Sequence, residues 1–139
     1  MYLLDTDTIV YLLKGHPEVR RNLGLHTDDV VGTSAVTLME LYYGAFKSQR
    51  VASNLARIRA LEKTVKIWDL GRETAEVFGL LKAELERDGN RPDDLDLAIA
   101  ACALSCQLTL VTNNVTHFSR VRGLRLENWA TSYRPAPGW

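Results

Sequence analysis

The chain has 139 residues, of which 46% are hydrophobic and 24% charged. These values are typical of one globular domain and exclude a low-complexity or fibrous chain. Seventeen basic residues balance 17 acidic ones, so the overall charge argues neither for nor against a nucleic-acid partner.

Two features bear on the compartment. No apolar run reaches the ~18 uncharged residues of a membrane span, and the N-terminus lacks the regions of a signal peptide. Cys102 and Cys106 share a helical face without a further Cys or nearby His, so we expect reduced thiols rather than a zinc site. A cytoplasmic protein is therefore expected.

The first half of the chain is predicted to begin with a strand over 2–5. A helical pattern follows over 9–13, and Pro17 opens a second helix. Residues 30–33 form the next predicted strand, and Ser34 is placed to cap a helix that runs to about Lys47.

The second half continues the alternation of helices and strands. Helices are predicted over 51–63, 73–87 and 93–106, and strands over 65–68, 108–112 and 124–126. Such alternation predicts an α/β fold with a parallel sheet covered by helices on both faces. In such sheets the working site lies beyond the C-terminal ends of the strands.

Asp5 and Glu40 are the first two candidate site residues. Asp5 ends the first predicted strand, although it could equally be a helix N-cap. Glu40 interrupts an apolar helix, where a charged residue is rarely buried unless it is paired or bound to metal. Gly44 lies one turn away and would leave room for a ligand, and the aromatic residues Tyr42, Tyr43 and Phe46 of this helix are expected mainly in the core.

Asp96 is the third candidate. It lies near the start of a wholly apolar helix, although Asp93 and Asp96 also resemble a capping box. If three carboxylates converge, each pair repels by about 4 kcal/mol at ~4 Å, so the cluster must hold protons or a cation. Oxygen ligands without His or Cys select hard ions such as Mg²⁺ or Mn²⁺.

Five short segments, taken in order, resemble the VapC toxins of the PIN-domain family. They are 3–6 (LLDT), 34–48 (SAVTLMEL, YGA and KS), 96–101 (Asp with IAA), 111–118 (VTNN and Phe) and 123–129 (GLRLENW). The resemblance implies a five-stranded parallel sheet between helices, with a PIN-like nuclease domain over 1–132 and a C-terminal tail over 133–139. It also implies a Mg²⁺-dependent endoribonuclease (with Mn²⁺ as a substitute), a cognate VapB-like antitoxin and a homodimer.

The resemblance also assigns roles by position. Asp5, Glu40 and Asp96 match the acidic metal ligands, and Thr112 is expected to position the metal or a water. Asn114 stands where many PIN domains have another acid, which weakens the case for a second metal site because an amide contributes no charge. The Asn113–Asn114 pair is similar to a branch associated with cleaving initiator tRNA in its anticodon stem-loop.

The expected chemistry is attack of a metal-activated water on the phosphate, leaving a 3′-hydroxyl and a 5′-phosphate. Basic residues supply RNA affinity without sequence choice, and the chosen candidates are Lys14, Lys47 and Arg50. His117 is expected to be solvated. Three further acids remain open: Asp93 or Asp94 could share the role of Asp96, and Asp7 stands where the family often carries Asn.

Two other functions compete with the nuclease. A non-catalytic PIN-like binding module would have a decayed site, with Asn114 as the first loss. A haloacid-dehalogenase-type phosphatase would use Asp5 as nucleophile and Asp7 as general acid. The short chain and a late acidic pair, Asp93–Asp94, that begins a helix argue against the phosphatase.

Overall fold

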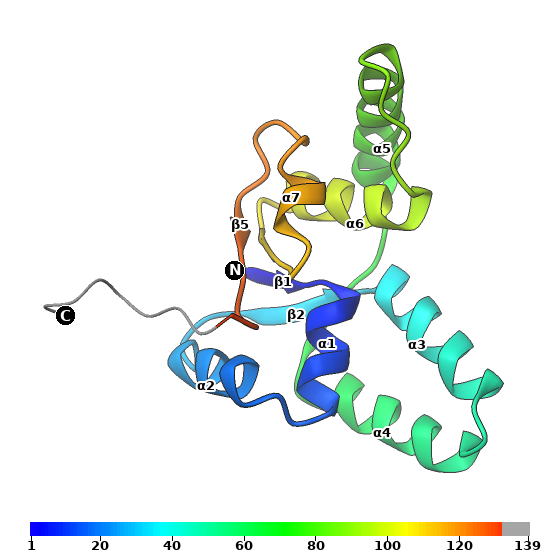
Figure 1. The fold of residues 1–139 in the computed structure, drawn as a ribbon, viewed down its shortest axis with the longest axis vertical. Helices are drawn as coiled ribbons and strands as arrows, with labels where there is room; N and C mark the ends of the chain where they lie inside the picture. Colours follow the sequence, from blue (N-terminus) through cyan, green and yellow to red (C-terminus); the bar gives the residue numbers. More distant parts are fainter. Residues whose placement is uncertain (132–139) are drawn as a thin grey trace, which may run out of the picture.

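In the computed structural model, which describes residues 1–131, five strands form one parallel sheet (Figure 1). The strands are β1 (Tyr2–Leu4), β2 (Val31–Ser34), β3 (Lys66–Trp68), β4 (Thr109–Val111) and β5 (Leu126–Glu127). Their order is β3-β2-β1-β4-β5, and each neighbouring pair is parallel. The predicted α/β architecture with a five-stranded parallel sheet is confirmed.

Helices connect the strands and cover the sheet. They are α1 (Thr6–Leu13), α2 (Pro17–Leu25), α3 (Ala35–Lys47), α4 (Val51–Thr64), α5 (Arg72–Arg87), α6 (Asp94–Ser105) and the short α7 (Val115–Phe118). In Figure 1, α5, α6 and α7 lie above the sheet, and α1, α2 and α4 lie below it. The molecule is thus a three-layer sandwich.

The strands bury both of their faces, as expected for a parallel sheet. Leu3 and Leu110 pack into the core formed with α5 and α6, whereas Leu4 and Val111 pack into the core formed with α1 and α4. Successive residues of a strand point to opposite faces, which divides each apolar run between the two cores. All four of these side chains are fully buried.

Local signals correctly predicted two helix starts. The Ser34 hydroxyl accepts a hydrogen bond from the Thr37 N–H at 3.2 Å at the start of α3. The Asp93 carboxylate caps α6 by accepting from the N–H groups of Leu95 and Asp96. Each cap satisfies backbone donors that have no partner within the helix.

The structure corrects several details. The last strand is Leu126–Glu127 rather than 124–126, and α7 is absent from the sequence prediction because its four residues show no apolar periodicity. Tyr43 and Phe46, expected in the core, are 67% and 64% exposed. Their described neighbours are on α3 itself: Lys47 Nζ lies 5.3 Å from the centroid of the Tyr43 ring, and the Tyr42 and Phe46 ring centroids are 6.4 Å apart.

The structure also bears on the two cysteines and on the expected absence of a membrane span. Cys102 is buried and Cys106 half-buried, and neither is in a disulfide. Within residues 1–131 no helix is long and apolar enough to cross a membrane. The predicted tail, 133–139, lies outside the described residues.

Candidate active site

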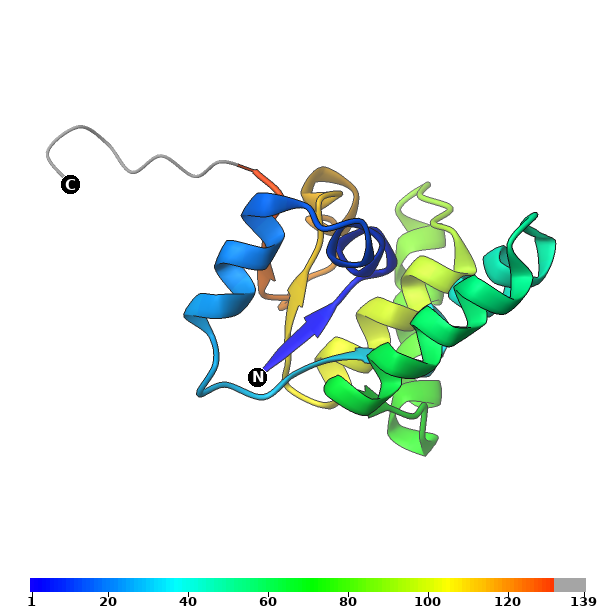
Figure 2. The ribbon, with the colours of Figure 1, turned by 90° about the horizontal axis from the view of Figure 1, so that it is seen from below.

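Asp5 lies at the C-terminal end of β1, where the order in which strands are added to the sheet reverses direction. From β1 the chain passes to β2 on one side and later returns to β4 on the other, and such a switch point opens a crevice at the strand ends. Leu4 pairs with Val111, so the next residues, Asp5 and Thr112, lie side by side. Figure 2 shows β1 running directly into α1. Asp5 is the N-cap residue of that helix.

The Asp5 carboxylate is held at both oxygens. The Thr112 hydroxyl donates to Oδ2 at 2.8 Å, and the Thr6 N–H donates to Oδ1 at 2.8 Å. The N-cap interpretation of Asp5 is therefore correct, but it engages only one oxygen. The other oxygen connects the ends of β1 and β4.

Glu40 reaches the same region from α3. Its Oε1 accepts from the Thr6 hydroxyl at 2.8 Å, and that hydroxyl lies 3.0 Å from the Thr37 hydroxyl. Because Thr6 also contacts Asp5, the structure joins Asp5 and Glu40 through one intervening residue. Glu40 is half-buried and lines a groove with Lys14, Gly44 and Arg57, and a Cβ on Gly44 would meet nothing within 4 Å.

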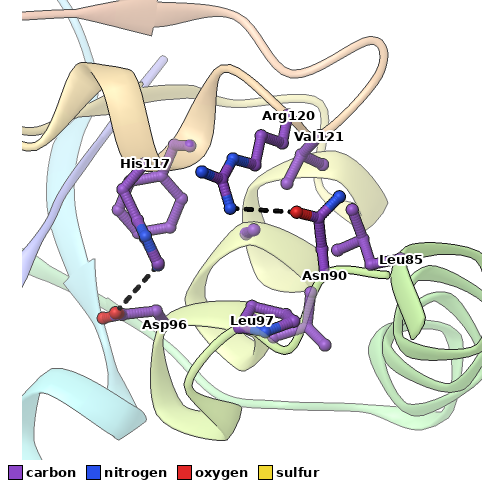
Figure 3. Close-up of a pocket in the computed structure, with 10 residues that line it drawn as sticks. Leu85, Asn90, Asp96, Leu97, His117, Arg120 and Val121 are labelled. Carbon is purple, nitrogen blue, oxygen red and sulfur yellow. Dashed lines mark hydrogen bonds and ion pairs between the residues drawn. The ribbon is translucent and has the colours of Figure 1, made fainter. Parts of the chain in front are cut away.

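Asp96 lies on the other side, at the start of α6. It is half-buried, and its Oδ2 lies 3.3 Å from Nε2 of His117 (Figure 3). Burial raises the pKa of the Asp96 carboxyl, as do the charges of Asp93 and Asp7, while His117 lowers it. His117, expected to be merely solvated, is thus a partner of a candidate site residue.

The charges of Asp7 and Asp96 act on the buried carboxyl of Asp5. Burial, above all, raises the pKa of Asp5 to about 7, with Asp7 and Asp96 adding to the rise. The hydrogen bonds from Thr112 and Thr6 act in the opposite direction. A cation between these side chains would favour the ionised form of Asp5.

Asp7 has a clear structural role that its sequence context leaves open. Its Oδ2 accepts from the Asn113 N–H at 3.0 Å, and its Oδ1 accepts from the Thr8 hydroxyl at 3.1 Å. Asp7 therefore fastens α1 to the loop that follows β4. No signal within a single segment indicates this contact, because 106 positions separate its partners.

The two asparagines after β4 differ in their surroundings. The Asn113 side chain contacts the Tyr11 hydroxyl at 3.5 Å and accepts from Asn128 at 3.2 Å. Asn114 donates its backbone N–H to the Thr112 hydroxyl at 3.0 Å, and its exposed side chain does not cap α7. Asn113 is thus the more firmly held of the pair.

The remaining candidates are only partly gathered at this site. Lys14 shares the groove of Glu40, whereas Lys47 and Arg50 are exposed at the turn between α3 and α4, outside that groove. Arg57, not among the candidates, lines the groove and donates to the Leu13 carbonyl. Asp94 pairs with Lys82 at 3.0 Å, so its carboxylate already has a cationic partner.

The donor chemistry fits a hard divalent cation. Asp5, Glu40 and Asp96 offer only carboxylate oxygens, and the burial of Asp5 with two acids nearby creates a need for positive charge. As the side chains stand in residues 1–131, no three His, Cys, Asp or Glu surround one point closely enough to enclose an ion. Mg²⁺ keeps several waters and is commonly held by one or two carboxylates, so these acids need not enclose it.

Comparison with known proteins identifies the family. The PIN domain model matches residues 2–124. The tRNA(fMet)-specific endonuclease VapC of Salmonella typhimurium is 37% identical over 129 residues, which are 92% of this chain and 97% of that protein. Ribonuclease VapC2 of Haemophilus influenzae is 39% identical over 129 residues, with coverage of 92% and 97%.

Solved structures support the same family. VapBC2 from Rickettsia felis, bound to a DNA fragment from their promoter, superposes with a TM-score of 0.87 at 35% identity, covering 92% of this chain and 98% of that one. VapBC-1 from nontypeable Haemophilus influenzae gives a TM-score of 0.85 at 32% identity, with coverage of 94% and 98%. Both similarities cover more than nine-tenths of each chain. The chain therefore belongs to the PIN domain family, among the VapC ribonucleases.

Proposed function

We propose that this chain is the toxin of a toxin–antitoxin pair, an endoribonuclease that hydrolyses an RNA phosphodiester with the help of Mg²⁺. The observation that carries the proposal is the buried carboxylate of Asp5 at the switch point of the sheet. The charges of Asp7 and Asp96 help to raise its pKa, and hydrogen bonds through Thr6 link it to Glu40. Relatives that share more than 30% of their residues with this chain are named ribonucleases.

The chain's own residues have distinct tasks in this reaction. Asp5 and Asp96, with Glu40, would hold the ion, which when bound polarises the phosphate and activates a water. Thr112 orients Asp5, and Thr6 orients Glu40. Mn²⁺ is expected to substitute because it accepts the same oxygen ligands.

Hydrolysis breaks one bond and makes one. The water oxygen bonds to phosphorus, the bond from phosphorus to O3′ breaks, and O3′ takes a proton and leaves as a hydroxyl. The products are a 3′-hydroxyl and a 5′-phosphate. Lys14 and Arg57, in the groove beside Glu40, supply positive charge for the RNA backbone.

The proposed substrate is initiator tRNA, cut in its anticodon stem-loop. Relatives from Salmonella typhimurium and Shigella flexneri, 37% and 39% identical to this chain, are named tRNA(fMet)-specific endonucleases. Asn113 and Asn114 follow β4 at the edge of the site, where they can contact the nucleotides beside the cut.

The proposed partners are a VapB-like antitoxin and a second copy of this chain. Similar solved structures are VapBC complexes. We expect the antitoxin to cover the acidic site or to bring a basic group to its carboxylates, because either would stop the reaction. The exposed stripe of Met39, Tyr43 and Phe46 on α3 supports a protein contact, since a large exposed apolar patch commonly marks one.

The test is cleavage of initiator tRNA by wild type, Asp5→Asn and Glu40→Gln, with mapping of the RNA ends. Wild type with Mg²⁺ or Mn²⁺ is expected to give discrete cuts with 5′-phosphates, and each variant to lose at least about 100-fold in rate. EDTA should abolish cleavage. Asp28→Asn, which changes an exposed acid outside the site, is the matched control and should cut normally.

Two results would contradict the proposal. Equal cleavage by the folded variants would remove Asp5 and Glu40 from the reaction. Absence of both cleavage and calorimetric Mg²⁺ or Mn²⁺ binding would favour the non-catalytic PIN-like module. The phosphatase interpretation is already wrong, because the PIN domain model matches residues 2–124 and Asp93–Asp94 open α6 instead of ending a strand.

A further inference from the structure

A second, much smaller hollow of about 20 Å³ lies beside Asp96, on the side of α6 and α7. Its polar lining includes Asn90, Asp96, His117 and Arg120, as Figure 3 shows. Asp96 thus borders this hollow, while Glu40 borders the groove of Lys14 and Arg57. The acids lie between two recesses, and each recess contains basic side chains.

Arg120 is the permanent positive charge of the second hollow. Its guanidinium donates to the Asn90 side-chain carbonyl at 3.0 Å, which is a neutral acceptor. Among residues 1–131 no acid lies within 4.0 Å of it, since the ion pairs there involve Arg21, Lys82 and His117. Arg120 is therefore oriented by Asn90 and forms no ion pair with the described residues.

Further arginines lie next to Arg120, in a recess that Asp5, Glu40 and Asp96 do not line. Arg120 also lines an adjoining recess of about 340 Å³ whose walls include Arg87 and Arg122. Glu84 and Asp88 lie in the same recess, so three arginines face two acids. A guanidinium suits phosphate because its planar donors match two phosphate oxygens and it is weakly hydrated.

We propose that Arg120 binds an RNA phosphate next to the one that is cleaved, and that the strand continues over Arg122 and Arg87. The proposal rests on the proposed ribonuclease function. The RNA strand would then cross the molecule from Lys14 and Arg57, past the acids, to Arg120. Asn90 acts as a positioning residue that holds the guanidinium over the hollow.

The test measures binding of fluorescein-labelled initiator tRNA by anisotropy over a salt series, in a Glu40→Gln background that stops cleavage. Arg120→Ala should weaken binding about tenfold and lower the slope of log Kd against log salt by about 0.7–0.9, the loss of one phosphate contact. Arg120→Lys should keep the slope and recover part of the affinity. Arg72→Ala, on an exposed arginine outside these recesses, should behave as the parent.

The outcomes separate the inference from the proposed function. An unchanged slope for folded Arg120→Ala, with tRNA still bound and cleaved by wild type, would overturn the inference alone. Weaker binding of the antitoxin with unchanged RNA binding would also overturn it, because the arginines would then serve a protein partner. Failure of the parent itself to bind or cut tRNA would overturn the proposed function and the inference together.

Discussion

The Asp5 carboxylate accepts two hydrogen bonds, but its burial disfavours the ionised form unless a cation is bound. The residue's backbone and one oxygen start α1, and its other oxygen receives the Thr112 hydroxyl. The residue is only 5% exposed, so ionisation must occur away from water and near Asp7 and Asp96. The hydrogen bonds offset only part of this cost, because the pKa remains about 7.

The burial of Asp5 predicts a pH-dependent stability. Its pKa is raised from 3.8 to about 7 by folding, so its unfavourable contribution is absent below pH ~4 and complete above pH ~7. Asp5→Asn should therefore stabilise the metal-free protein, and by about 2–3 kcal/mol more at pH 8 than at pH 5. Urea unfolding at both pH values, with EDTA present, measures the difference.

The control for this experiment is Asp28→Asn, which removes an exposed carboxylate. It should show no comparable pH-dependent gain. An Asp5→Asn effect of equal size at pH 5 and pH 8 would mean that the carboxyl of Asp5 titrates normally in the folded protein.

At the scale of the elements, the sheet depends on a close contact between β2 and β3. A Cβ on Gly32 would lie 2.1 Å from the Lys66 carbonyl oxygen and 2.7 Å from the Trp68 ring. Only glycine allows this approach, and β2 leads directly into α3, which carries Glu40. The contact thus supports the position of a candidate site residue.

Gly32→Ala is expected to destabilise the fold by about 2–3 kcal/mol, because backbone and ring must move apart. Gly79→Ala is the matched control: a Cβ there meets nothing within 4 Å inside α5, and it should stabilise by about 0.5–1 kcal/mol. Denaturant unfolding of both variants gives the two values. A Gly32→Ala protein as stable as wild type would show that the strands separate easily.

At the scale of the whole molecule, the exposed apolar face of α3 is the surface through which we propose that two copies of the chain associate. Met39, Tyr43 and Phe46 recur at spacings of four and three, so they share one helix face, and all are at least 60% exposed. Side chains of this size contribute strongly to protein interfaces.

We therefore expect wild type to be a dimer in sedimentation velocity at micromolar concentration. Tyr43→Glu combined with Phe46→Glu should weaken association by about 100-fold or more while the chain stays folded. Leu80→Glu, at a 56% exposed position on α5, should leave the dimer intact. A double variant that remains dimeric would place the interface elsewhere.

The sequence by itself determined the α/β class, the parallel sheet, most helix positions and the strand-end locations of Asp5 and Thr112. Periodicity and caps operate over a few neighbouring residues, and the rule for parallel strand ends needs only the positions of the strands along the chain. The family resemblance added the five-stranded sheet, which the structure confirms, and the nuclease function, which the comparisons confirm.

Only the tertiary structure decided which side chains meet. The bond from Asn113 to Asp7 spans 106 positions, and the contact of His117 with Asp96 joins two helices that share no sequence pattern. The exposure of Tyr43 and Phe46 likewise depends on what packs against α3, since apolar residues at helical spacing predict burial in any amphipathic helix. Packing between distant segments, which local propensity does not encode, therefore completed the site and left one helix face open.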